Sequence, residues 1–101
     1  MNERIDCENA LRRHLENPFL VLAVPRRSSR EDVEREGARW LAMLGAGMKD
    51  AATYATPLGP RARMPELVRK ALAQLRDPER RLVHEWWVEA LGFEPAGLKH
   101  L

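Results

Sequence analysis

The chain is poor in cysteine, in aromatic residues and in long hydrophobic runs. Its single cysteine, Cys7, excludes a disulfide within the chain and favours a reducing compartment. No stretch approaches the ~18 consecutive apolar residues that a membrane-spanning helix needs. The first fourteen residues, MNERIDCENALRRH, are too charged for the hydrophobic part of a secretory signal. We therefore expect a cytoplasmic protein with no membrane partner.

Residue patterns that carry catalysis or bind metals are also lacking. On one helix Cys7 and His14 would lie ~10 Å apart, which is too far for a hydrogen-bonded nucleophile and base. The spacing of His14, His84 and His100 matches no common zinc motif, and Val88 stands where a second ligand would follow His84 in an H-E-x-x-H motif. No glycine-rich phosphate-binding loop is present. We expect no enzymatic activity, no cofactor, no metal and no small-molecule substrate.

A strong excess of charge of one sign is absent, because the formal net charge is only +2. The arginines cluster locally, but Glu66, Asp77 and Glu79 interrupt them, so nucleic acid is not expected as a partner. A small helix-turn-helix regulator stays open as an alternative. Its recognition helix would have to be 65–76, whose outward face has few side chains that read bases.

What the chain does have is a series of helix signals that fit one domain over residues 1–101. A first helix is predicted over 6–16, with Cys7, Leu11 and Leu15 on one apolar side. Asn17-Pro18 ends it. The apolar run 19–24 fits either a short buried strand or one helical turn.

A second helix is predicted to begin at Ser28 or Ser29, since both have capping-box spacing to an acidic residue three positions later. Val33, Gly37, Trp40, Leu41 and Leu44 trace its apolar stripe. A glycine in mid-helix costs stability, and a close approach of another helix would explain Gly37. Gly45 and Gly47 are predicted to end this helix.

The segment 48–64 has no clear period and is predicted to be a long loop, with a turn around 49–54. Pro65 begins a third helix that runs to about Arg76. Asp77-Pro78 then caps and begins a fourth helix, which runs to Leu91 and ends at Gly92. Its predicted buried side consists of Leu82, Val83, Trp86, Ala90 and Leu91.

Three of these segments resemble a J domain, the helical hairpin of DnaJ-type co-chaperones. They are Asn17–Val24 (NPFLVLAV), Ser29–Leu44, and Leu75–Glu85 (LRDPERRLVHE). The resemblance covers about residues 18–86. It implies an all-α fold, in which a J-domain-like antiparallel helical hairpin carries an added N-terminal helix and a short C-terminal helix.

The resemblance also implies a lost activity. Where the family carries His-Pro-Asp, which activates the ATPase of the partner chaperone, this chain has Gly45-Ala46-Gly47. The second helix is acidic, with Glu31, Asp32, Glu34 and Glu36, where active members present a basic face. We therefore do not expect stimulation of a heat-shock ATPase. An active co-chaperone with a non-standard turn stays open as an alternative.

The sequence thus predicts a protein-interaction adaptor whose partner is another protein, or a second copy of the chain. Because neighbouring helix residues point about 100° apart, Trp86 and Trp87 cannot both lie centrally in a small core. One is expected inside and the other at a boundary, where tryptophan often anchors an interface. The C-terminal tail, with Phe93 and Leu98, could instead cover the second tryptophan. Candidate partner-binding residues are Tyr54, Arg61, Arg63, Trp86 and Trp87.

Overall fold

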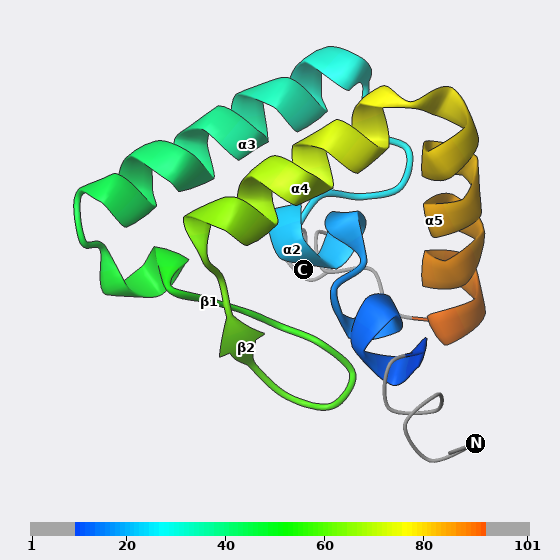
Figure 1. Ribbon diagram of the computed structural model, residues 1–101, viewed down its shortest axis with the longest axis horizontal. Coiled ribbons are helices and arrows are strands. Elements are labelled where there is room, and N and C mark those ends of the chain that lie inside the picture. The colour runs from blue at the N-terminus through cyan, green and yellow to red at the C-terminus, as the bar shows by residue number, and fades with distance from the viewer. Residues whose placement is uncertain (1–9, 93–101) are drawn as a thin grey trace, which may run out of the picture.

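The computed structural model describes residues 10–92 and consists mostly of helices (Figure 1). Residues 10–15 are helical, in agreement with the first predicted helix, whereas Asp6 and Cys7 lie outside the described residues. The remaining elements, in chain order, are α2 (Pro18–Leu22), α3 (Arg30–Gly45), η1 (Lys49–Ala51, a 3-10 turn), β1 (Thr53–Tyr54), β2 (Arg61–Ala62), α4 (Pro65–Arg76) and α5 (Pro78–Leu91). The mostly helical character expected from the sequence is confirmed.

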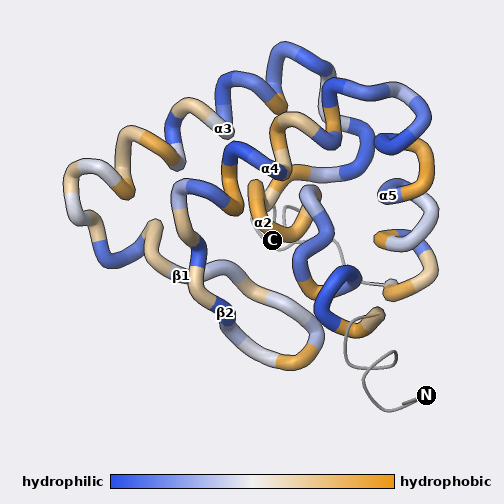
Figure 2. The backbone as a smooth tube through the Cα atoms, viewed as in Figure 1, coloured by the Kyte–Doolittle hydropathy of each residue, from blue (hydrophilic) through white to orange (hydrophobic). Residues whose placement is uncertain are grey.

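The short helix α2 forms the centre of the core. The apolar run that fitted a strand or a helical turn is helical, because Asn17 accepts a hydrogen bond from the Phe19 amide (3.0 Å) and Pro18 occupies the first turn. All five residues of α2 are buried. In Figure 2 the α2 backbone is largely hydrophobic, while the part of α3 near its start is largely hydrophilic. The core therefore lies under the α3–α4 pair.

Helices α3 and α4 lie side by side in opposite directions (Figure 1). Arg76 near the end of α4 pairs with Glu34 near the start of α3, at 2.7 Å. Further along α3, Gly37 faces Leu72. The Ser29 hydroxyl accepts a hydrogen bond from the Asp32 amide (3.0 Å), which confirms the predicted start of α3. The predicted antiparallel hairpin is thus present.

The segment 48–64 is more ordered than the predicted loop. After η1, β1 and β2 form a small antiparallel sheet, in which Thr53 pairs with Ala62 and Tyr54 with Arg61. The turn between the strands is held by Thr56, whose hydroxyl donates to the Gly59 carbonyl at 2.6 Å. The all-α expectation therefore needs a correction at this point. Two residues per strand give too short a pattern for the alternation of a strand to show in the sequence.

The bounds predicted for the last two helices are confirmed. Asp77 ends α4, and its side chain accepts a hydrogen bond from the Glu79 amide (3.0 Å) at the start of α5. Gly92 ends α5 in a left-handed conformation, with φ of 65°. At the Asp77 turn the chain changes direction, so that α5 crosses the end of the α3–α4 pair steeply (Figure 1).

The prediction of which side of α5 is buried is wrong. Its predicted residues Leu82, Val83, Trp86, Ala90 and Leu91 are all exposed, and Leu11 on the first helix is exposed as well. The buried side of α5 instead carries Val88, with half-buried Arg81 and His84.

Hydrogen bonds of Arg81 account for this orientation of α5. Its Nη2 donates to the carbonyls of Arg26 and Ser28, in the loop before α3. Its Nε donates to Glu85, one turn further along α5, at 2.9 Å. These bonds turn the Arg81 side of α5 toward the core. Apolar residues surround more than half of this helix, so their period alone could not select the buried side.

The contact between Gly37 and Leu72 gives a stability prediction. A methyl group added at Gly37 would lie 2.7 Å from Leu72 Cδ1 and 2.8 Å from Cγ, so the Leu72 side chain or the two helices would have to move. We expect Gly37→Ala to lower the free energy of unfolding by about 1–3 kcal/mol, measured by urea denaturation. The matched control is Gly45→Ala in the same helix, where nothing lies within 4 Å. A Gly37→Ala protein as stable as the control would contradict the close approach.

Candidate interaction surface

An apolar strip on α5 faces outward. The side chains of Leu82, Val83 and Trp86 occupy one face of the helix and are 67%, 54% and 60% exposed. We call these three residues the α5 apolar face. Single exposed apolar residues are common on proteins, but a contiguous group that includes tryptophan is typical of an interaction site.

The two tryptophans differ in environment, and not in the way we expected. Trp86, placed on the predicted buried side, is exposed, whereas Trp87 is half-buried. The ring of Trp87 lies 4.0 Å from the ring of His14 and 4.8 Å from the ring of Trp86, which it meets edge to face. Trp87 therefore connects the α5 apolar face to the helix formed by residues 10–15. Phe93 and Leu98, which could have covered a tryptophan, lie outside the described residues.

A cleft of about 440 Å³ opens between that first helix and α5. We call it the His14–His84 cleft. Its lining residues are Ala10, Arg13, His14, Asn17, Val83, His84 and Trp87. Asn17 closes one end, because its Nδ2 donates to the His84 carbonyl at 3.1 Å. The cleft thus combines basic groups with an aromatic wall.

The environment of His84 favours its neutral form. Burial lowers the pKa of the His84 imidazole, and the nearby positive charges of Arg80 and His14 lower it further. A smaller recess next to the cleft is lined by Arg13, Glu16, Lys70, Gln74 and His84. Cationic side chains therefore approach His84 from the first helix, from α4 and from α5.

Two of the expected partner-binding residues, Tyr54 and Arg63, are inside the protein. Tyr54 is 3% exposed, and its hydroxyl donates to the Leu15 carbonyl at 3.0 Å. Burial raises the pKa of this hydroxyl. The correction is that Tyr54 ties β1 to the first helix and is not open to a partner. Its place in a polar, proline-containing segment gave no sign of burial.

Arg63 is also 3% exposed and acts as an internal cross-link. Its Nε donates to the Val21 carbonyl at 2.8 Å, and its Nη1 donates to the carbonyls of Ala51 and Thr53, each at 3.1 Å. The guanidinium carbon lies 3.6 Å from the centroid of the Trp40 ring. Burial lowers the pKa of Arg63 to about 10, so the side chain is still charged at neutral pH. Arg63 joins α2, η1, β1 and α3.

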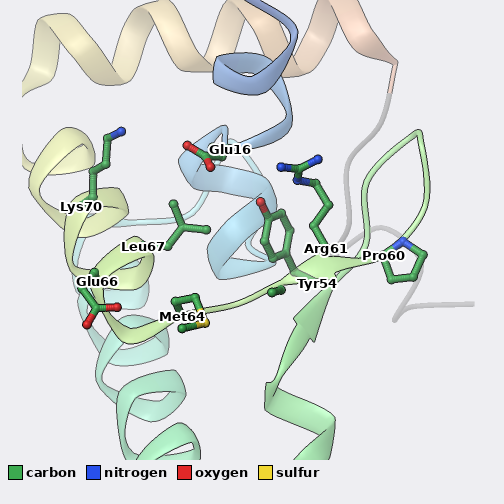
Figure 3. A pocket seen from close by; sticks show the side chains of 9 residues that line it. Glu16, Tyr54, Pro60, Arg61, Met64, Glu66, Leu67 and Lys70 are labelled. Carbon is green, nitrogen blue, oxygen red and sulfur yellow. The ribbon is translucent and has the colours of Figure 1, made fainter. Parts of the chain in front are cut away.

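Arg61, the remaining candidate in the hairpin, is half-exposed beside a second groove of about 660 Å³ (Figure 3). Figure 3 shows Arg61 and Tyr54 from the hairpin facing Leu67 and Lys70 of α4, with Glu16 above them. The charged lining residues are Glu16, Arg61, Glu66 and Lys70, two of each sign. This balance of charge gives the groove no selectivity for a ligand of one charge. The structure brings together Trp86 and Trp87, but places Arg61 at this separate groove.

Among residues 10–92, no three His, Cys, Asp or Glu side chains gather as ligands for one metal ion. None of the helices there combines the length and apolarity that a bilayer-spanning segment requires. Comparisons with protein-family models, with curated proteins and with solved structures found no match to this chain.

Neither the His14–His84 cleft nor the α5 apolar face was predicted from the sequence. His14 and His84 were considered as metal ligands and Arg13 was not considered, but all three are lining residues of one cleft. Leu82 and Val83 were expected in the core. No sequence signal joins these residues, because residues 13 and 84 are far apart in the chain.

The bonds of Arg63 predict a large effect of its removal. Arg63→Gln leaves buried carbonyls without donors, so we expect the free energy of unfolding to fall by about 2–4 kcal/mol in urea denaturation. The control is Arg61→Gln, two residues earlier on β2, which is half-exposed and should cost less than about 1 kcal/mol. Equal losses in the two variants would show that Arg63 is not the cross-link.

The lowered pKa of His84 predicts that acid destabilises the protein. Below pH 6.5 the unfolded chain takes up a proton at His84 before the folded protein does. Stability is therefore fully present above pH 6.5 and falls from there down to the lowered folded pKa. The pKa of Glu34 is lowered from 4.5 by its bond to Arg76, so its contribution is lost only in more acidic solution.

We expect the free energy of unfolding to decrease as the pH falls below 6.5, and His84→Gln to remove most of that slope. Urea denaturation at a series of pH values measures it. His14→Gln serves as the comparison, since His14 contributes to the shift of His84 only as its last cause. A slope unchanged in His84→Gln would refute the assignment.

Proposed function

We propose that this protein is a non-enzymatic protein-interaction module, built on a degenerate J-domain-like scaffold and working in the cytoplasm. The observation that carries the proposal is the α5 apolar face. Leu82, Val83 and Trp86 are exposed although other residues of the same helix pack against the core. Exposed apolar area with a tryptophan at its centre favours contact with another protein.

The arrangement of elements supports the J-domain-like part of the proposal. A short buried helix, an antiparallel hairpin and a helix that begins at Asp77-Pro78 follow each other in the order that the sequence resemblance implies. The α3–α4 connection is longer than a simple turn, because η1 and the β1–β2 sheet lie within it.

The surface of α3 supports the absence of chaperone activation. Glu34 is paired with Arg76 of α4, and Glu36 with Arg39 at 3.1 Å. Acidic and basic side chains therefore alternate on this helix, and it presents no continuous basic face to an acidic chaperone. Gly45, Ala46 and Gly47 stand at its end, where they offer no side-chain chemistry.

The proposal predicts that the α5 apolar face is needed for association. We expect Leu82→Ser and Trp86→Ala to weaken binding about tenfold or more, since interface anchors cost over 1 kcal/mol when truncated. Binding is measured for a partner isolated from the native cytoplasm, and self-association by analytical ultracentrifugation. The matched control is Leu58→Ser in the β1–β2 turn, because Leu58 is 68% exposed and Leu82 is 67% exposed.

Three results would overturn the proposal. The first is the absence of any partner and of self-association for the unchanged protein. The second is an equal loss of binding in Leu58→Ser. The third is a clear increase in ATP turnover when the protein is added to a DnaK-type chaperone. That increase would favour the active co-chaperone that the sequence left open.

A further inference from the structure

We propose that the His14–His84 cleft is a carboxylate-binding subsite, which takes an acidic side chain of the protein that docks on the α5 apolar face. This inference rests on the proposed function, and it names the chemistry of the partner. The partner would present apolar residues to α5, with a Glu or Asp beside them that enters the cleft.

The cleft and the α5 apolar face form one continuous surface. Val83 belongs to both, because it is 54% exposed on α5 and also lines the cleft. Trp87 lines the cleft, and its ring meets the ring of Trp86 edge to face at 4.8 Å. One segment of a partner can therefore cover Trp86 and reach the cleft from the same side of α5.

The charges around the cleft favour an anion. Arg13 lines it, and Lys70 lies at the adjoining recess. Neither of these two side chains takes part in an ion pair with any residue in 10–92. The charge of Arg80, one turn earlier on α5, lowers the pKa of His84. The Nε of Arg80 lies 3.7 Å from Oδ2 of Asp77. The acidic group facing His84 is Glu16, in the recess.

A carboxylate would thus meet more positive than negative charge, next to a low-dielectric aromatic wall that strengthens the attraction. His84 adds positive charge when it is protonated, and a bound anion favours that protonation. The size of the cleft, about 440 Å³, admits a carboxylate with an attached apolar group. The groove in Figure 3 lacks this bias, because its charged lining residues are balanced.

The first experiment uses a small probe on the full chain. The imidazole signals of His14 and His84 are followed by NMR through a pH titration, with 3-phenylpropionate or with its neutral amide. Because an opposite charge within a few ångströms stabilises the imidazolium, saturating carboxylate should raise the titration midpoint of His84 by about one unit. The amide should leave the midpoint in place. No shift with the carboxylate, or equal shifts with both probes, overturns the proposal.

Two neighbouring arginines provide a matched pair of variants. Arg13 lines the cleft, whereas the exposed Arg12 beside it does not. Both side chains are exposed, so we expect Arg13→Gln to weaken 3-phenylpropionate binding about two- to fivefold, the range for a solvent-exposed charge pair, and Arg12→Gln to leave it unchanged. Equal effects of the two variants would mean attraction by overall charge, which contradicts a defined subsite.

A second probe tests the acidic partner itself. It is an amphipathic helical peptide with Leu on one face and Glu beside it, compared with the same peptide carrying Gln. Tighter binding of the Glu peptide, lost in Arg13→Gln and in Leu82→Ser, supports the proposal. Equal binding of the two peptides overturns it, as does a self-association that occupies the cleft. If Leu82→Ser leaves partner binding intact while the cleft still takes 3-phenylpropionate, the proposed function fails and the subsite stands.

Discussion

The buried guanidinium of Arg63 is the interaction on which the arrangement of this fold depends. It donates to the carbonyls of Val21, Ala51 and Thr53, and lies over the ring of Trp40. These groups belong to α2, η1, β1 and α3. A cation without a carboxylate beside it is costly to bury, so its desolvation must be offset by those carbonyls and by the aromatic face. Trp40 in turn donates its indole N–H to the Leu22 carbonyl at 2.7 Å, which closes the network.

This network explains why the long segment between α3 and α4 is ordered. Within 48–64 the sheet has only two residues per strand, too few to be stable alone. Arg63 on one side and the Tyr54 hydroxyl on the other attach it to α2 and to the first helix. A polar, glycine- and proline-containing segment therefore acquires a fixed shape from contacts with residues about forty positions away in the chain.

The parts of the fold that the sequence predicted are those with local causes. Caps and prolines act within a few residues, so Ser29, Asp77 and Pro65 fixed the starts of α3, α5 and α4 in the prediction. Gly37 indicated a close helix approach, and Leu72 provides it. The J-domain resemblance and the adaptor role stay predictions, since no described contact tests them.

The parts that could not be predicted depend on contacts between distant residues. Tyr54 and Arg63 are buried because they hydrogen-bond to partners such as the carbonyls of Leu15 and Val21. No pattern in 48–64 indicates these partners. The orientation of α5 follows from bonds between Arg81 and the carbonyls before α3. An amphipathic period gives the angle between neighbouring residues of a helix, but with apolar residues on more than one face it does not select the face that is buried.

The orientation of α5 also bears on the meaning of its exposed residues. Val88 and the bonds of Arg81 attach this helix to the core, and Asn17 attaches it to α2 through the His84 carbonyl. None of these contacts uses Leu82, Val83 or Trp86. Apart from the edge-to-face contact of Trp86 with Trp87, folding of the described range therefore gives little reason for apolar side chains at these three positions, and polar ones would be favoured there by hydration. The proposed role in association would supply the reason, and the proposed carboxylate subsite beside them would restrict which partners satisfy it.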